Sequence, residues 1–234
     1  METNPRFQEM QLQVAPDLAI SANLGIPEWW PSGNRVGLVM AHDVGSDMER
    51  EFLVWLQRRL VDQGILSLRF NFPFAEQGKK RPDPEAVLDR AYRAAISGLM
   101  QDPQNAPAQL VFAGFGLGCR VAAQILAHGG KADALVCLGY PLHVAGKPSQ
   151  LKADPLFRVI CSTLFVQGTR DTNCRIDRLQ GLLRRMGAPT RLAAIEEADH
   201  ALQPIKRAAR SEEDVREEIG AAVQSFLLQV TGPF

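Results

Sequence analysis

The five residues Gly114-Phe115-Gly116-Leu117-Gly118 follow an apolar run and precede a stretch with helical spacing. The sequence G-x-S-x-G between a strand and a helix forms a tight turn that presents its serine as a nucleophile. The first N–H groups of such a helix stabilise the negative charge that develops on a substrate oxygen. Here the middle residue is Gly116, which has no nucleophilic atom. We therefore expect the turn to form without the group that starts acyl transfer.

Two ionisable side chains follow later predicted strands. Asp171 ends the segment Leu164-Phe165-Val166-Gln167-Gly168-Thr169-Arg170-Asp171, and His200 ends Glu197-Ala198-Asp199-His200. The chain order is therefore turn, acid, base, which is the order of a hydrolase triad built on this turn. An earlier segment, 40–46, follows a predicted strand where a loop supplying oxyanion contacts would lie.

The elements that position these residues are predicted from apolar periodicity. Alternation from Met10 to Leu24, interrupted at Pro16-Asp17, indicates an antiparallel hairpin. Short apolar runs then alternate with amphipathic helical stretches, which favours a mostly parallel sheet of about eight strands with helices on both faces. The predicted inner strands are 36–41, 65–70, 110–113, 134–138, 163–166 and 192–195. Ligands of such sheets bind at the carboxyl ends of the strands.

The motifs around Gly116, Asp171 and His200, together with Leu138-Gly139-Tyr140-Pro141-Leu142-His143, resemble the α/β-hydrolase superfamily. The resemblance runs from about residue 36 to residue 204. It is strongest to the small, lidless branch of dienelactone-hydrolase-like proteins, especially the group of testis-expressed protein 30 and the third regulatory subunit of the NSL complex. It implies a hydrolase fold without a cap domain and an activity on esters, lactones or acyl groups.

The resemblance also implies roles for individual residues. Asp171 is the triad acid, His200 the base, and Val44 and Leu117 supply the oxyanion-hole N–H groups. The expected substrate-binding residues are His42, Asp43, Phe115, Tyr140 and His143. The chain departs from the family at Gly116 and at Asp43, which replaces the glycine that usually follows the histidine. A carboxylate beside an oxyanion site repels developing negative charge unless it points away.

Other candidate residues have simpler interpretations. Ser46 with Glu49 fits a capping box better than a substitute nucleophile. Cys119 is expected on the helix after the turn, facing the core. His42, Asp43, Asp47, Asp199 and His200 match no defined metal-binding spacing. We therefore predict neither a metal nor a cofactor.

Composition limits the remaining classes. The 234 residues, of which 46% are hydrophobic, suit one domain spanning 1–234. The 26 basic and 26 acidic residues give no net charge, so we expect no nucleic-acid partner. No apolar run reaches the roughly 20 residues that span a bilayer, and the first residues lack a signal-peptide pattern. These features predict a cytoplasmic protein without a membrane partner, and they leave open whether it is a monomer or a homodimer. Trp29-Trp30, before the third strand, is expected to pack internally or form an interaction patch.

Three hypotheses about function remain. The chain is a catalytically silent family member that binds a small molecule or a partner, or it is a hydrolase or lyase that uses water on the pair His200 and Asp171. Alternatively, it is a serine esterase whose nucleophile was replaced. We favour a hydrolase-family protein whose standard activity is missing or strongly reduced.

Overall fold

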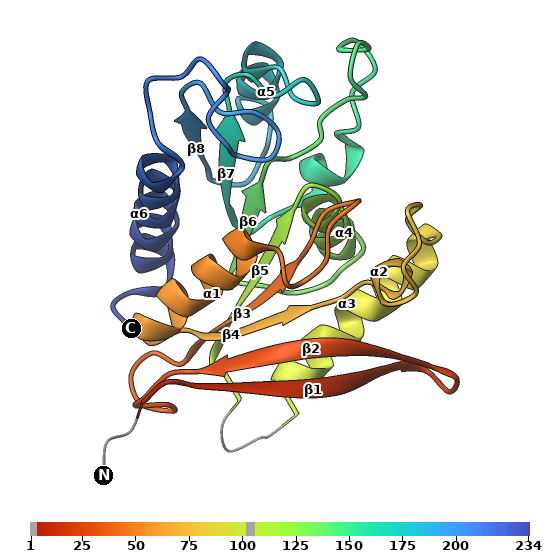
Figure 1. Ribbon diagram of the computed structural model, residues 1–234, viewed down its shortest axis with the longest axis vertical. Helices are drawn as coiled ribbons and strands as arrows, with labels where there is room; N and C mark the ends of the chain where they lie inside the picture. Colours follow the sequence, from red (N-terminus) through yellow and green to blue (C-terminus); the bar gives the residue numbers. More distant parts are fainter. Residues whose placement is uncertain (1–3, 102–105) are drawn as a thin grey trace.

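The computed structural model describes residues 4–101 and 106–234. Its centre is one eight-stranded sheet with strand order β1-β2-β4-β3-β5-β6-β7-β8 (Figure 1). The strands are β1 (Arg6–Ala15), β2 (Leu18–Ile26), β3 (Val36–Ala41), β4 (Leu66–Phe70), β5 (Gln109–Phe115), β6 (Ala134–Leu138), β7 (Ser162–Gly168) and β8 (Thr190–Ile195). The predicted hairpin is confirmed, because β1 pairs antiparallel with β2 and places Leu12 opposite Ile20. Strand β2 joins β4 antiparallel, and the strands from β4 to β8 pair in parallel.

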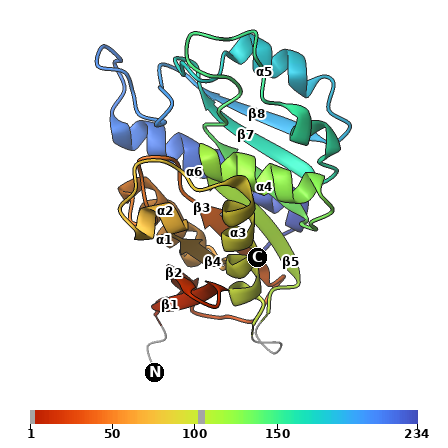
Figure 2. The same cartoon turned by 90° about the vertical axis from the view of Figure 1, so that its right-hand side faces the viewer.

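Helices cover both faces of this sheet, as predicted. They are α1 (Glu51–Asp62), α2 (Pro73–Glu76), α3 (Glu85–Leu99), α4 (Leu117–Ala127), α5 (Ile176–Leu183) and α6 (Glu212–Thr231), with a short 3₁₀ helix at Asp154–Arg158. Helices α1 and α6 lie on one face, and α3 and α4 lie on the other (Figures 1 and 2). Successive residues of β3 show why both faces are apolar: Leu38 packs with the core beneath α1 and α6, whereas Val39 packs with the core beneath α3 and α4. The architecture is the predicted one, and residues 4–101 and 106–234 include no separate cap domain.

Two local predictions at helix ends differ from the structure. The capping box at Ser46 is wrong, because α1 begins at Glu51 and Arg50 is its N-cap. The side chain of Asp47 instead accepts a hydrogen bond from the Glu49 N–H at 2.9 Å, which forms a local turn before the helix. The apolar spacing from Ile176 to Met186 predicts a helix closed by Gly187, whereas α5 ends earlier, at Leu183. Ser211 does cap α6, in a reciprocal arrangement with Asp214.

Parallel pairing determines where the chemistry lies. Strands β3 and β5 are neighbours in the sheet, as are β7 and β8, and each pair is parallel. Their carboxyl ends therefore point to one edge, where the loops carrying Asp43, Gly116, Asp171 and His200 follow β3, β5, β7 and β8 respectively. The topology thus brings Asp43 and His200 into contact, although they are 157 positions apart in the sequence.

Candidate active site

The turn after β5 has the tight geometry expected of a nucleophile-bearing turn. Gly116 lies between β5 and α4 with φ +51° and ψ −111°, a backbone conformation that residues other than glycine adopt only with strain. Gly114 has no room for a side chain, because a Cβ there would lie 2.2 Å from the Gly118 carbonyl carbon. The backbone therefore forms the predicted tight turn, and Gly116 at its apex carries no side chain.

The space above Gly116 is filled by Asp43, which comes from the loop after β3. A Cβ added to Gly116 would lie 2.0 Å from Cγ of Asp43 and 2.1 Å from its Oδ1. Oδ1 accepts a hydrogen bond from the Leu117 N–H at 2.7 Å, and the Val44 N–H also hydrogen-bonds to this carboxylate. Leu117 and Val44 are the two residues predicted to form the oxyanion hole. The carboxylate thus points towards Gly116 and engages both N–H groups that were predicted to form the oxyanion hole.

The imidazole of His200 lies between two carboxylates. Its Nδ1 is 2.7 Å from Oδ2 of Asp171, and its Nε2 is 3.2 Å from Oδ2 of Asp43. The Asp171 side chain is completely buried and accepts further hydrogen bonds from the Asn173 N–H at 2.6 Å and the Gln167 side-chain amide at 2.5 Å. The structure therefore brings Asp43, Gly116, Asp171 and His200 together as one carboxylate–imidazole–carboxylate array.

The charges of this array favour a doubly protonated imidazole. Burial lowers the pKa of His200, but hydrogen bonds to Asp171 and Asp43 outweigh it and raise the pKa to about 10. Burial raises the pKa of Asp43, but hydrogen bonds with His200, Leu117 and Val44 outweigh that effect and hold it below its ordinary value. At neutral pH His200 is therefore protonated and donates through both nitrogens. It has no free lone pair with which to act as a general base while Asp43 remains ionised.

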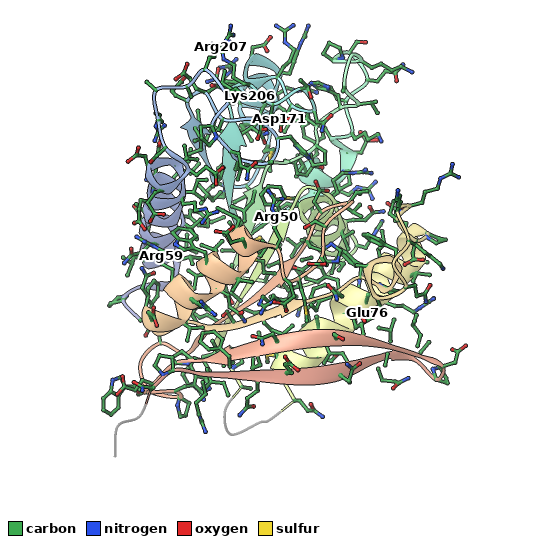
Figure 3. All side chains as sticks on the ribbon, in the orientation of Figure 1. Arg50, Arg59, Glu76, Asp171, Lys206 and Arg207 are labelled. Carbon is green, nitrogen blue, oxygen red and sulfur yellow. The ribbon has the colours of Figure 1, made fainter. Side chains whose placement is uncertain are left out.

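Sequence reasoning missed two residues that support the array. Arg50, at the start of α1, places its guanidinium carbon 4.0 Å from the centre of the Phe115 ring, and its Nη2 donates to the Ala201 carbonyl at 2.8 Å. Figure 3 labels Arg50 and Asp171 on the edge of the sheet that carries the array. Arg50 also interacts electrostatically with Asp43 and Asp199. Gln167 lies within the quoted strand motif, but its buried position next to Asp171 depends on the loop that follows β7.

Of the residues predicted to bind substrate, Asp43 belongs to the array, and three others also use their polar side-chain atoms in hydrogen bonds within the protein. His42 is fully buried, with Nε2 accepting from the Phe72 N–H at 2.9 Å and Nδ1 donating to the Asp43 carbonyl at 2.8 Å. Tyr140 donates to the Lys152 carbonyl at 3.1 Å. Nε2 of His143 accepts from the Arg175 N–H at 3.1 Å, and its Nδ1 donates to the Val144 carbonyl.

Two of these predicted substrate-binding residues, His42 and Phe115, contact members of the array in different ways. His42 fixes the backbone of Asp43 to the chain after β4, because its two ring nitrogens join the two segments. Burial lowers the pKa of His42, so its imidazole is neutral at physiological pH. The buried Phe115 ring lies between Arg50 and His200, with its centre 6.4 Å from that of the imidazole. Contact of any of these residues with substrate remains a prediction.

Other groups near the site offer no competing chemistry. Cys119 is buried and donates its thiol to the Gly114 carbonyl, and burial raises the pKa of that thiol well above its ordinary value. Within residues 4–101 and 106–234, no group of three or more His, Cys, Asp or Glu side chains is arranged to hold a metal ion. No helix in the described part of the chain is long and apolar enough to cross a membrane.

A large surface hollow lies far from the array. A cavity of about 630 Å³ is lined by Trp29, Trp30, Gly64 and Phe234 among others. Trp30 precedes β3 and Gly64 precedes β4, so this hollow lies at the amino ends of the parallel strands. Because ligands of parallel sheets bind at the carboxyl ends, the size of this hollow does not make it the candidate active site.

The family follows from comparison with known proteins. A family model described as alpha/beta hydrolase domain matches residues 34–228. The chain belongs to the α/β-hydrolase family. This range contains every residue of the array, so the α/β-hydrolase assignment and the site concern the same part of the chain.

Solved α/β-hydrolase structures share the complete fold at low sequence identity. Dienelactone hydrolase from Anabaena variabilis has a TM-score of 0.76 and 16% identity, covering 97% of this chain and 99% of that one. A serine hydrolase without a lid from Xanthomonas campestris has a TM-score of 0.70 and 19% identity, covering 97% and 96%. An esterase from Pyrococcus furiosus has a TM-score of 0.75 and 14% identity, covering 99% and 94%. At these identities the matches establish the fold alone.

Proposed function

We propose that this chain is an α/β-hydrolase-family protein that lacks ordinary serine-esterase activity. The observation that carries the proposal is the position of Asp43, whose carboxylate occupies the space above Gly116. Gly116 removes the nucleophile, and Asp43 prevents water or a substrate carbonyl from taking that place. The two departures from the family thus act on one point of the site and reinforce each other.

The occupied oxyanion hole weakens any residual ester hydrolysis. The Leu117 N–H already donates to Asp43 at 2.7 Å, so a substrate oxyanion would have to compete with a fixed negative charge. Removing one oxyanion-hole donor costs about 10² to 10³ in rate. Water activation by His200 is disfavoured as well, since both imidazole nitrogens face carboxylates. These arguments favour the proposal of a protein without esterase activity, here called the silent-esterase proposal, over an enzyme that uses water on His200 and Asp171.

The third hypothesis, a serine esterase altered only at its nucleophile, also fits poorly. A serine at position 116 collides with Asp43 as that carboxylate now lies, because the contacts to its Cβ would be near 2 Å. Gly116 and Asp43 therefore suit each other. We propose that they form a matched pair, and that the fold's pocket accepts a small ester, lactone or acyl ligand without turning it over by a serine.

A four-variant comparison tests the proposal. Wild type, Asp43→Gly, Gly116→Ser and the double variant are assayed on p-nitrophenyl acetate and butyrate. The double variant has an open oxyanion hole, a serine and the Asp171–His200 pair. We expect it to exceed either single variant by about 100-fold or more, because triad members act as a unit. Wild type should stay at the buffer rate.

The matched control adds His200→Ala to the double variant, and it should return hydrolysis to the background. The proposal is rejected if wild type hydrolyses these esters at a rate that His200→Ala abolishes. Circular dichroism of each variant ensures that a low rate reports chemistry and not unfolding.

A further inference from the structure

The hollow at the amino ends of the parallel strands presents an exposed indole. Its volume of about 630 Å³ lies within the range of about 300 to 1,000 Å³ that is typical of small-molecule sites. Its two tryptophans differ in environment, because Trp30 packs against the core whereas Trp29 is 72% exposed. The turn that carries them is held by hydrogen bonds from the Trp30 N–H to the Pro27 carbonyl at 3.2 Å and from the Ser32 N–H to the Trp29 carbonyl at 2.8 Å. The hollow therefore offers a ligand an indole on a backbone that hydrogen bonds already fix.

The charges that line the hollow are negative. Among the described residues that line it, the only ionisable side chains are those of Glu28 and Asp62, and both are exposed acids. Asp62 is the last residue of α1, and the C-terminal end of a helix carries partial negative charge on its unpaired carbonyl groups. An indole face also attracts cations, more strongly than the rings of tyrosine or phenylalanine do. The carboxylates, the helix terminus and the indole therefore all favour a positively charged ligand.

One hydrogen-bond acceptor of the lining has no donor. Gln63, the residue directly after α1, lines the hollow, and its Oε1 is buried without a hydrogen-bond partner among the described residues. A buried acceptor in this state is destabilising, and a ligand N–H that reaches it removes the cost. A quaternary ammonium has no N–H to donate. An amidinium or guanidinium carries several N–H groups in one plane, and this planar group also packs on aromatic faces.

We propose that this hollow is a binding site for small, flat organic cations with N–H donors, the amidine and guanidine class. Trp29 packs on the face of the cation, the carboxylate of Asp62 attracts its charge, and Oε1 of Gln63 accepts one of its N–H groups. Val61 and Pro27, which are buried and line the hollow, offer apolar surface to the rest of the ligand. The site lies at the opposite end of the strands from the carboxylate–imidazole–carboxylate array, so it goes beyond the proposed function and does not depend on it.

Two probes of nearly the same shape test the preference for charge. Benzamidine and benzamide are both flat aryl compounds with N–H donors, but only benzamidine is a cation at neutral pH. Binding to the wild-type protein is followed by NMR through the indole N–H signals of its three tryptophans, and Trp29→Phe identifies the signal of Trp29 by its loss. Trp55 is the internal control, since it lies on α1 with its ring centre 5.5 Å from the Arg59 guanidinium carbon and does not line the hollow.

Benzamidine should shift the Trp29 signal and leave the Trp55 signal in place. It should bind at least about tenfold more tightly than benzamide, because the indole and the carboxylate both act on the positive charge. Equal affinity for the two probes overturns the proposal, because the hollow would then recognise an aromatic ring whatever its charge. Absence of a Trp29 shift overturns it too, because the cation would not bind in the hollow.

Variants of the lining provide a second readout, measured by titration calorimetry with benzamidine. Trp29→Leu keeps an apolar side chain but removes the indole, and it should weaken binding by about 2- to 30-fold. Asp62→Asn removes one charge and should weaken binding by about 2- to 5-fold. Gln63→Met keeps the length of the side chain but removes the acceptor, and it should weaken binding by about tenfold. None of the three replaced residues is buried, so each variant should fold.

Asp17→Asn is the matched control for Asp62→Asn. Asp17 is an exposed acid in the turn between β1 and β2 and does not line the hollow, so its loss should leave benzamidine binding unchanged. Equal weakening by the two substitutions would mean that benzamidine responds only to the net charge of the protein, which rejects the site. Affinity that stays at the wild-type value in Trp29→Leu or in Gln63→Met rejects it as well, because neither the indole nor the acceptor would then be shown to hold the cation as proposed.

Discussion

Replacing Gly116 by serine should cost far more stability when Asp43 is present than when it is absent. The serine Cβ would lie 2.0 Å from Cγ of Asp43, so the carboxylate must rotate away. It then loses its hydrogen bonds with Leu117 and His200. Hydrogen bonds that involve a charged group contribute about 1.5 to 3 kcal/mol each. The backbone at φ +51° adds about 1 to 3 kcal/mol of strain for any side chain.

These terms predict different costs in two backgrounds. In the wild-type background, Gly116→Ser should lower the free energy of unfolding by about 4 to 9 kcal/mol, from the lost hydrogen bonds and the strain together. In the Asp43→Gly background only the strain remains, about 1 to 3 kcal/mol. The coupling free energy between the two positions is then about 3 kcal/mol or more, far above the ~0.5 kcal/mol expected of independent sites.

Urea unfolding of the four proteins measures this coupling. Ala123→Ser, on the helix that follows the turn, serves as the control. Its cost in free energy of unfolding should be the same with and without Asp43. Equal costs of Gly116→Ser in the two backgrounds would refute the reasoning, because they would mean that Asp43 does not occupy the space above Gly116.

Three further predictions concern the groups around the array. The pKa of His200 is raised to about 10, so its stabilisation is present below the ordinary pKa of histidine and is lost as pH rises through about 10. The difference in free energy of unfolding between wild type and His200→Gln should shrink by about 2 to 3 kcal/mol between pH 6.5 and pH 10.5. This is less than the full pKa shift implies, because His200 is partly exposed. A difference that stays constant in urea titrations across this pH range would contradict the prediction. Gln167→Leu removes the amide donor of the buried Asp171 and should cost about 1 to 3 kcal/mol in the same measurement, and a neutral effect would show that the bond contributes nothing. Ser211→Ala removes the N-cap of α6 and should cost about 1 kcal/mol, whereas Ser46→Ala, which caps no helix, should cost less than half of that in thermal unfolding.

The arrangement of the fold was predictable because its signals are local and repeated. Apolar runs marked the parallel strands, and the alternation before and after Asp17 marked the hairpin. Asp171 and His200 could be placed on one edge because both follow strands of a parallel sheet, and the carboxyl ends of such strands share an edge. No side-chain direction was needed for either inference.

The direction of Asp43 could not be predicted in this way. It lies in an irregular loop, and its orientation depends on a hydrogen bond from Leu117, which is 74 positions away. The sequence showed a carboxylate near an oxyanion site but not whether it points in or out. Ser46 illustrates a related difficulty, since a capping pattern was present but the turn formed by Asp47 delays the helix to Glu51.

The central claim is that the Asp43 carboxylate lies in the nucleophile's place and contacts His200, and an NMR titration of the His200 imidazole tests it most directly. We predict that His200 of the wild type remains doubly protonated at pH 8, titrates near pH 10, and titrates at lower pH in Asp43→Gly. Titration near the ordinary histidine value of about 6.5, unchanged by Asp43→Gly, would contradict the account.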